Sequence, residues 1–308
     1  MANDTTDNNA NIPKPDFRDV FSDYLELTKP KVVALLVLTA VVGMVLATPK
    51  EPTIALVFWS MIGIGFLSAA AAAINHIVDY EIDSKMARTH HRPVAKGRVT
   101  TTNAAIFAFA LAIIGFVALA LMANWLTAWL TLASLFGYAV FYTMYLKRAT
   151  PQNIVIGGLA GAMPPLLGWT AMTGEIHGHA LLLVMIVFIW TPPHFWALAI
   201  HRKEDYARVN MPMLPVTHGV EFTKNAIFLY TVLLIVICVL PYLVGMSGLI
   251  YLATSLVLNI WFLWHAWKLK FAEQQSTAYD MFKFSIIHLM VLFIGLIIDH
   301  FWMITPLR

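Results

Sequence analysis

The chain has 308 residues, of which 59% are hydrophobic and only 12% are charged, and its mean hydropathy is +0.72. This composition excludes a soluble globular protein and is typical of a polytopic membrane protein. The net charge of +3 does not indicate nucleic-acid binding, because the basic residues gather on one side of the predicted membrane, and the single cysteine, Cys238, excludes disulfides within one chain.

Nine apolar segments are long enough to cross a bilayer as helices. They cover residues 32–48, 54–74, 104–122, 125–145, 154–173, 180–200, 225–245, 249–267 and 284–302. The predicted fold class is therefore all-α, with nine transmembrane helices. We expect a polar tail at residues 1–23 and a single transmembrane domain at residues 24–308.

The basic residues predict how the bundle is oriented. Of the 20 lysines and arginines, all except Lys50 and Arg308 lie in the N-terminal tail or in loops on the same side of the membrane. The positive-inside rule places this side, and the N-terminus, in the cytoplasm. The first residues are polar and acidic, unlike an arginine-rich transit peptide, so we expect a bacterial cytoplasmic membrane.

The second span leads into a polar segment, NHIVDYEIDSKMARTHHRPVAKGR, residues 75–98. Asn75, Asp79 and Asp83 are four residues apart, so a continuing helix places them on one face, with Glu81 on the opposite side. Two carboxylates and an amide oxygen are hard oxygen ligands that suit Mg²⁺. Acids at a helix C-terminus oppose the helix dipole, which argues against a purely structural role.

Basic residues follow these acids, among them Arg88 and Arg92. Arginine forks match phosphate oxygens in two-pronged geometry, and Lys147 adds a cation at the cytoplasmic end of the fourth span. The positive-inside rule alone also accounts for these cations, so a solvated helix end stays open as the alternative. Acids and cations together indicate a metal-bridged diphosphate site.

A second acidic segment, HRKEDYARVN, follows the sixth span. Glu204 and Asp205 are candidate ligands of a second Mg²⁺, and Arg202, Lys203 and Tyr206 are candidate diphosphate contacts. The two acidic segments lie four spans apart on the same side of the membrane, so we expect them to converge over one site. The alternative is an ordinary solvated loop.

His194 lies within the sixth span, directly after Pro192 and Pro193. A proline pair leaves backbone carbonyls unpaired and is expected to open the helix beside a cavity. Ionisable groups inside a membrane are often functional, although a lone histidine in a helix is more often a satisfied core residue. His194 is therefore a candidate ligand-binding residue.

The motifs as a set resemble the UbiA superfamily of intramembrane prenyltransferases and, within it, the protohaem IX farnesyltransferases, also called haem O synthases. The resemblance extends from about residue 24 to the last span. It rests on TKPKVV, NHIVDYEIDSKMARTHHRPV, YTMYLKRATPQNIVIGG, GAMPPLLGW, TPPHFWALAI and EDYARVNMPMLPV. It implies a helical bundle around a central cavity, and transfer of a farnesyl group from farnesyl diphosphate, with addition of water, to protohaem IX.

The resemblance also implies roles for individual residues. Mg²⁺ is the implied cofactor, and His194 falls on an intramembrane histidine for which haem contact is implied. The implied catalytic residues are Asn75, Asp79, Asp83, Arg88 and Arg92. Many members of the superfamily carry a second Asp-x3-Asp motif, whereas this chain has Asp205 followed by Asn210. This departure leaves the second Mg²⁺ in doubt.

The partners implied are farnesyl diphosphate, protohaem IX, the lipid bilayer and haem A synthase as the recipient of the product, with no nucleic acid. Two other functions stay open at this point. A prenyltransferase for a quinone precursor or another aromatic acceptor requires the same diphosphate site. A transporter or haem-handling channel requires polar groups near the bilayer midplane, whereas here they gather mainly at the cytoplasmic ends of the spans.

Overall fold

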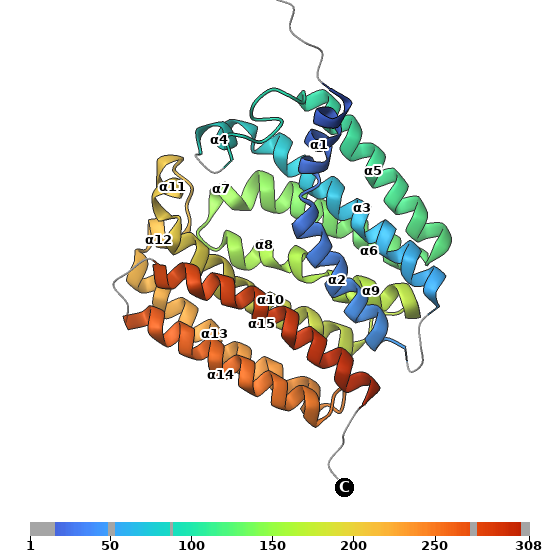
Figure 1. Cartoon of the computed structure of the whole chain (residues 1–308), viewed down its shortest axis with the longest axis vertical. Helices are drawn as coiled ribbons and strands as arrows, with labels where there is room; N and C mark the ends of the chain where they lie inside the picture. Colours follow the sequence, from blue (N-terminus) through green and yellow to red (C-terminus); the bar gives the residue numbers. More distant parts are fainter. Residues whose placement is uncertain (1–15, 49–52, 87–88, 272–275, 303–308) are drawn as a thin grey trace, which may run out of the picture.

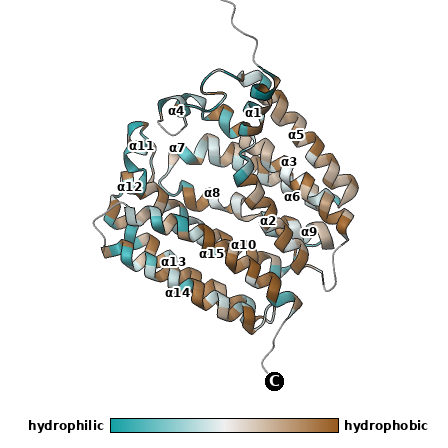
Figure 2. Ribbon diagram, in the orientation of Figure 1, coloured by the Kyte–Doolittle hydropathy of each residue, from teal (hydrophilic) through white to brown (hydrophobic). Residues whose placement is uncertain are grey.

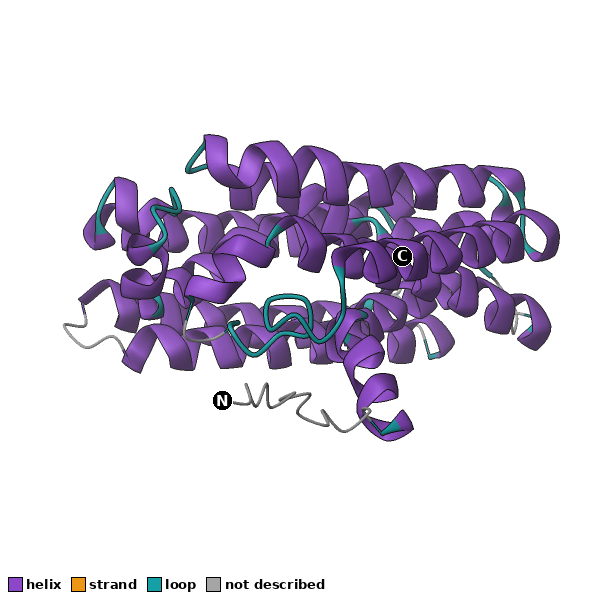
Figure 3. Cartoon of the chain, turned by 90° about the horizontal axis from the view of Figure 1, so that it is seen from above, coloured by secondary structure: helices purple, strands orange, loops and turns teal. Residues whose placement is uncertain are grey.

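Long apolar helices make up the fold of this protein, as Figure 3 illustrates. The computed structural model describes residues 16–48, 53–86, 89–271 and 276–302, and within these ranges it contains helices and connecting turns but no strand. The helices of the first half are α1 (Phe17–Leu27), α2 (Pro30–Leu46), α3 (Ile54–Val78), α4 (Tyr80–Lys85), α5 (Thr101–Met122), α6 (Trp125–Phe136), the π-helix η1 (Gly137–Leu146) and α7 (Lys147–Ala149). Those of the second half are α8 (Asn153–Ala162), α9 (Pro164–Thr173), α10 (Gly178–His201), α11 (Lys203–Arg208), α12 (Leu214–Thr217), α13 (Val220–Leu243), α14 (Leu249–Phe271) and α15 (Ser276–Phe301).

All nine predicted spans coincide with helices. In the described residues, eight helical stretches are long and apolar enough to cross a membrane, and α2 adds a ninth as part of a pair with α1 that is bent by 49°. Helices form here because a backbone in hydrocarbon must satisfy its own hydrogen bonds. The predicted division between residues 23 and 24 falls inside α1, and the orientation of the bundle remains a prediction.

The first and last spans meet and close the bundle (Figure 1). Spans that are neighbours in sequence pack against each other, as α3 does with α5 and α14 does with α15, while α15 also contacts α2. His300 Nε2 at the end of α15 donates a hydrogen bond to the carbonyl oxygen of Thr48, 2.9 Å away. Elements from the two ends of the chain therefore lie side by side.

Glycines allow α2 and α9 to approach each other closely. A Cβ atom at Gly168 would lie 1.9 Å from the carbonyl oxygen of Ala40, and one at Gly43 would lie 2.0 Å from that of Pro165. Small residues permit such backbone contact, which strengthens van der Waals packing between membrane helices. This contact fixes α2, and with it the residue that precedes α2, against the rest of the bundle.

The hydrophilic residues are concentrated at one end of the bundle, which we call the polar end (Figure 2). The short helices α4, α7 and α11 lie at this end in Figure 1, although α4 and α11 follow different spans. The prediction that the two acidic segments lie on the same side of the bundle agrees with this arrangement.

Candidate active site

The first acidic segment lies at the junction of α3 and α4. Asp79 has φ −90° and ψ 3°, so it separates the two helices by a single residue, where an uninterrupted helix was expected. The pattern of backbone hydrogen bonds nevertheless continues, because the Asp79 N–H donates to Asn75 O at 3.0 Å and the Asp83 N–H donates to Asp79 O at 2.8 Å. Asp79 and Asp83 are buried, with 1% and 4% exposure, while Glu81 is exposed, as its spacing predicted.

Two of the predicted diphosphate-binding cations contact the buried acids directly. Lys147 Nζ lies 2.5 Å from Asp79 Oδ2, which also accepts a hydrogen bond from Asn75 Nδ2 at 2.9 Å. Arg92 Nη1 donates to Asp83 Oδ2 at 2.6 Å. The structure therefore brings the acids and cations of the predicted site together. Arg88 lies outside the described residues.

Lys29 is a member of this cluster that the sequence analysis considered only as evidence of orientation. It lies between α1 and α2 in the left-handed conformation, with φ 49°, and its ammonium group donates a hydrogen bond to Asn75 Oδ1. Burial, together with the charges of Arg92 and Lys147, lowers the pKa of Lys29 to about 7. The sequence feature that could have identified Lys29 is its position directly before Pro30. A proline favours the first position of a helix, so it indicates that α2 begins there and that Lys29 lies at its N-terminus.

The π-helix η1 supplies a second face of the site. Thr143 Oγ1 donates to Tyr138 O, five residues earlier, at 2.8 Å, and it lies 3.5 Å from Asn75 Nδ2. The rings of Tyr138 and Tyr142 have centroids 5.4 Å apart. π-Helical segments are rare and frequently occur at functional sites.

Several buried polar atoms at the polar end have no hydrogen-bond partner among the residues that the structure describes. They include Oδ1 of Asp79, both ring nitrogens of His76 and Oδ1 of Asn153. Because an unpaired buried polar atom is costly, such atoms mark places for a bound ligand.

The available oxygens fit Mg²⁺. The described residues contain no group of three or more His, Cys, Asp or Glu side chains arranged for a metal. Magnesium, however, typically takes one or two carboxylates together with water and substrate phosphate oxygens. Asp79, Asp83 and the amide oxygen of Asn75 are such a partial set, and the unpaired Oδ1 of Asp79 offers a free ligand.

The second acidic segment forms α11 and the residue before it. Asp205 lies 3.8 Å from Arg202 Nη1 and 3.9 Å from Arg208 Nη1, so its ion pairs are local, and Glu204 is exposed. Tyr206, also on α11, is partly buried and packs against the hydrophobic core of the bundle. The predicted roles of Lys203 and of these acids as ligands of a second metal stay predictions.

His194 lies deeper, in α10, which continues as a helix through Pro192 and Pro193. Its position is about 12 Å along the helix axis from Arg202, at 1.5 Å per residue. The imidazole is stacked between Trp190, with centroids 4.2 Å apart, and Phe282, with centroids 4.7 Å apart. The ring is 8% exposed.

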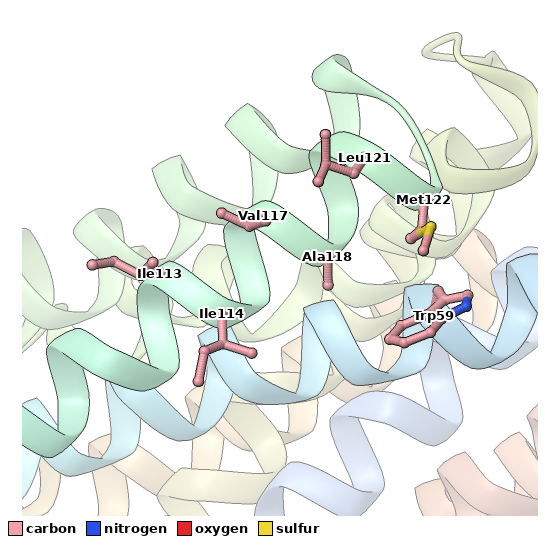
Figure 4. A pocket seen from close by; sticks show the side chains of 7 residues that line it. All are labelled: Trp59, Ile113, Ile114, Val117, Ala118, Leu121 and Met122. Atoms are coloured by element: carbon pink, nitrogen blue, oxygen red, sulfur yellow. The ribbon is translucent and has the colours of Figure 1, made fainter.

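A separate groove lies near the opposite end of the bundle, and none of the residues that line it belongs to this site (Figure 4). It measures about 350 Å³ and runs between α3 and α5. Its lining consists of Trp59, Ile113, Ile114, Val117, Ala118, Leu121 and Met122. None of these side chains is charged, so the groove suits a lipid acyl chain and has no means of binding diphosphate.

Comparison with known proteins places this chain in a family. The chain belongs to the UbiA prenyltransferase family, whose model matches residues 36–293. It is 64% identical to protoheme IX farnesyltransferase 2 of Pseudoalteromonas atlantica over 92% of this chain and 93% of that protein. It is also 64% identical to protoheme IX farnesyltransferase of Colwellia psychrerythraea, over 91% and 92% of the two chains.

Solved structures share the fold at lower sequence identity. A structure reported for digeranylgeranylglyceryl phosphate synthase matches with a TM-score of 0.77 and 21% identity over 92% of this chain and 99% of that one. A UbiA homologue from Archaeoglobus fulgidus bound to GPP and Mg²⁺ matches with a TM-score of 0.63 and 14% identity, over 89% and 99%. At these identities the similarity establishes a common fold.

Proposed function

We propose that this protein transfers the farnesyl group of farnesyl diphosphate to a vinyl group of protohaem IX, with addition of water, giving haem O and diphosphate. The observation that carries the donor half of this proposal is the buried cluster of Asp79 and Asp83 with Lys29, Arg92 and Lys147. The acceptor half is supported by relatives that share 64% identity over nine-tenths of the chain and are named protoheme IX farnesyltransferases.

Asn75, Asp79 and Asp83 are the proposed holders of Mg²⁺. When bound, Mg²⁺ neutralises the charge that develops on the departing diphosphate. Asp79 is the central residue of the three, because one of its oxygens is held by Asn75 and Lys147 while the other has no partner among the described residues. The helix break at Asp79 keeps its carboxylate within the bundle while the chain turns into α4.

Lys29, Arg92 and Lys147 are the proposed diphosphate-holding cations of the first cluster. In the structure they pair with the acids or with Asn75, and when Lys29 is protonated, below its pKa of about 7, the three positive groups outnumber the two carboxylates of Asp79 and Asp83. A site with this excess attracts a multiply charged anion. Donors already fixed in a buried site stabilise the charge on a leaving group more strongly than mobile water does.

The reaction then proceeds by ionisation and capture. The bond between C1 of the farnesyl group and the diphosphate oxygen breaks, and its electron pair leaves with the diphosphate. The faces of Tyr138 and Tyr142 shield the allylic cation from water. The π electrons of a haem vinyl group form the new carbon–carbon bond, and water adds to the resulting cation and releases one proton to the diphosphate.

The residues around α11 form the other part of the proposed diphosphate site. We assign diphosphate contacts to the basic residues and the tyrosine, and a second metal position to the two acids. The diphosphate contacts are Arg202, Lys203 and Tyr206, together with Arg88 of the first segment. The metal ligands are Glu204 and Asp205. The location of α4 and α11 at the same end of the bundle supports this arrangement (Figure 1).

His194 is the proposed contact to the haem. It is the histidine of α10 that lies below the diphosphate cluster and is held between two aromatic rings. A porphyrin is large and apolar, so it fits a position deeper in the membrane than the charged diphosphate. We therefore propose that farnesyl diphosphate lies nearer the polar end of the bundle than the haem does.

The proposed location is the bacterial cytoplasmic membrane, with the polar end facing the cytoplasm. Both the positive-inside rule and the water solubility of diphosphate support this side. Haem A synthase is the proposed recipient of haem O.

Mass analysis of haem extracted from cells with and without this protein tests the proposal. We expect a haem species heavier by one farnesyl group and one water only in cells that contain the protein. The absence of this species, with the protein inserted in the membrane, would contradict the proposed function.

A second experiment identifies the acceptor directly. Purified protein is incubated with farnesyl diphosphate, Mg²⁺ and either protohaem or a hydroxybenzoate, and the products are analysed by mass. We expect the prenyl increment on haem alone. A farnesylated hydroxybenzoate would instead assign the protein to quinone-type prenyl transfer.

A further inference from the structure

Ser285 of α15 fixes the protonation state of the His194 ring. The Ser285 hydroxyl donates to the carbonyl oxygen of Phe282 at 2.6 Å, and its oxygen lies 2.6 Å from Nδ1 of His194. A serine hydroxyl has a single proton, so an oxygen that already donates to a carbonyl must accept from the imidazole. The hydrogen-bond network therefore assigns the proton of the neutral ring to Nδ1, which leaves the lone pair on Nε2.

The orientation of the ring is fixed as well. Trp190 stacks on one face of the imidazole at an interplanar angle of 18°, and Phe282 stacks on the other at 28°. A 180° flip of the ring about the Cβ–Cγ bond would keep its plane and both stacks, but it would put Cδ2 in the place of Nδ1 and so lose the hydrogen bond to Ser285. Nε2 is therefore held in one direction, as an unprotonated nitrogen in a ring that keeps 8% exposure.

The packing of α10 against α15 does not depend on the Ser285 hydroxyl. Trp190 Nε1 donates to the backbone carbonyl oxygen of Ser285 at 3.0 Å. This bond survives any substitution of the side chain, so removal of the hydroxyl alters the imidazole while the helices stay in register.

We propose that Ser285 is a positioning residue that keeps His194 protonated at Nδ1 and presents Nε2 as an axial ligand to the iron of the haem substrate. The inference rests on the proposed function, because it deepens the haem contact assigned to His194. A histidine that ligates a metal through one nitrogen typically donates the other N–H to a fixed acceptor, which orients the ring and raises its basicity. Ser285 is that acceptor here.

The test is titration of the purified protein in lipid nanodiscs with ferric protohaem, followed by optical absorption and electron paramagnetic resonance. We expect Ser285→Ala to weaken haem binding about 10- to 100-fold and to alter the spectrum of the histidine-bound iron. Ser285→Thr retains a hydroxyl and is expected to restore both. Thr231→Ala is the matched control, because Thr231 is a fully buried hydroxyl on α13 that donates to its own helix at 2.8 Å.

A chemical rescue tests the same hydrogen bond without any change at Ser285. In His194→Gly protein, added imidazole is expected to restore the axial-ligand spectrum, because it has both a ligating nitrogen and an N–H for Ser285. Added 1-methylimidazole has no N–H and is expected to restore it at least tenfold less well. In the Ser285→Ala, His194→Gly double variant, we expect the two compounds to act equally.

The outcomes separate this inference from the proposed function. A wild-type spectrum and affinity in Ser285→Ala, or equal rescue by the two compounds in His194→Gly, would overturn the role of Ser285 whether or not farnesyl transfer occurs. Histidine-ligated haem in a protein that forms no farnesylated product would instead overturn the proposed function and leave the ligation in place.

Discussion

At the scale of single residues, the position of Asp79 between α3 and α4 accounts for its proposed role in holding Mg²⁺. It ends α3, precedes α4, and holds Lys147 with one carboxylate oxygen while the other has no partner. A carboxylate that is 1% exposed at the edge of a membrane is strongly disfavoured unless it is paired. The adjacent cations meet this requirement in the substrate-free protein, and diphosphate with Mg²⁺ meets it in the proposed complex.

Asp79→Asn tests this residue with little change in volume. We expect the rate of product formation to fall about 10²- to 10³-fold, because a group fixed to stabilise the departing charge is lost. Product is measured by mass analysis, and insertion is measured as the amount of protein extracted from membranes. Glu81→Gln, an exposed acid of the same segment, is the matched control and should retain activity. Full activity of Asp79→Asn would argue against its role in holding the metal.

Lys29→Met tests the cation that lies before α2. A charged hydrogen bond contributes about 1.5–3 kcal/mol, so we expect the KM for farnesyl diphosphate to rise about 10- to 100-fold. Lys31→Met is the control, because Lys31 is exposed two residues further along the chain. Steady-state kinetics over a range of farnesyl diphosphate concentrations measures both variants. An unchanged KM in Lys29→Met would remove Lys29 from the diphosphate site.

At the scale of elements, the position of Lys29 depends on how α2 is held. The backbones of α2 and α9 come into contact at Gly43 and Gly168, and α1 departs from α2 at 49°. Arg98, in the loop after α4, pairs with Asp23 of α1 at 2.8 Å. The two helices and the loop thus fix Lys29 from both sides, and a change in this packing is transmitted to the cluster.

Gly168→Ala tests the contact between α2 and α9. The added methyl group would lie 1.9 Å from a backbone oxygen, so the helices must separate, at a cost of about 1–3 kcal/mol in the free energy of unfolding. We expect a lower thermal unfolding midpoint in detergent and reduced activity. Gly161→Ala makes the same change on α8, where no neighbouring atom lies within 4 Å, and should leave the midpoint unchanged. Equal midpoints for the two variants would show that the α2–α9 contact tolerates a larger separation.

At the scale of the whole molecule, the nine spans require the two ends of the chain to lie on opposite sides of the membrane. The positive-inside rule predicts that the N-terminus and the polar end face the cytoplasm. This orientation gives water-soluble diphosphate access to the cluster of Asp79 and Lys147, while the lipid-facing groove lies at the other end.

Reporter fusions test this orientation. We expect alkaline phosphatase fused after residue 308 to be active and green fluorescent protein at the same position to be dark, because the predicted orientation puts the C-terminus outside the cytoplasm. Fusions placed after residue 271, between the last two spans, should give the opposite result. Fluorescence at the C-terminus would require either the reverse orientation or an even number of spans.

The nine spans and the stripe of Asn75, Asp79 and Asp83 could be predicted from the amino-acid sequence alone. Long apolar runs have a single stable solution in lipid, because the backbone must form its own hydrogen bonds, and a spacing of four residues holds along any helix. Both features are local, so their prediction requires no knowledge of which helices meet. The one-residue break at Asp79 was not predicted, and it left the shared face intact.

Which groups distant in sequence come into contact depends on how the helices pack. Lys29 reaches Asn75 across 46 positions, and Ser285 reaches His194 across 91. The buried carboxylate of Asp299 on α15 accepts hydrogen bonds from the backbone of Gly248 and Tyr251 at the start of α14. Such contacts follow from the packing of whole helices, which local spacing does not encode. The proposed metal-binding role of Asn75, Asp79 and Asp83 could therefore be predicted from the sequence, whereas the contact with Lys29 depends on the fold.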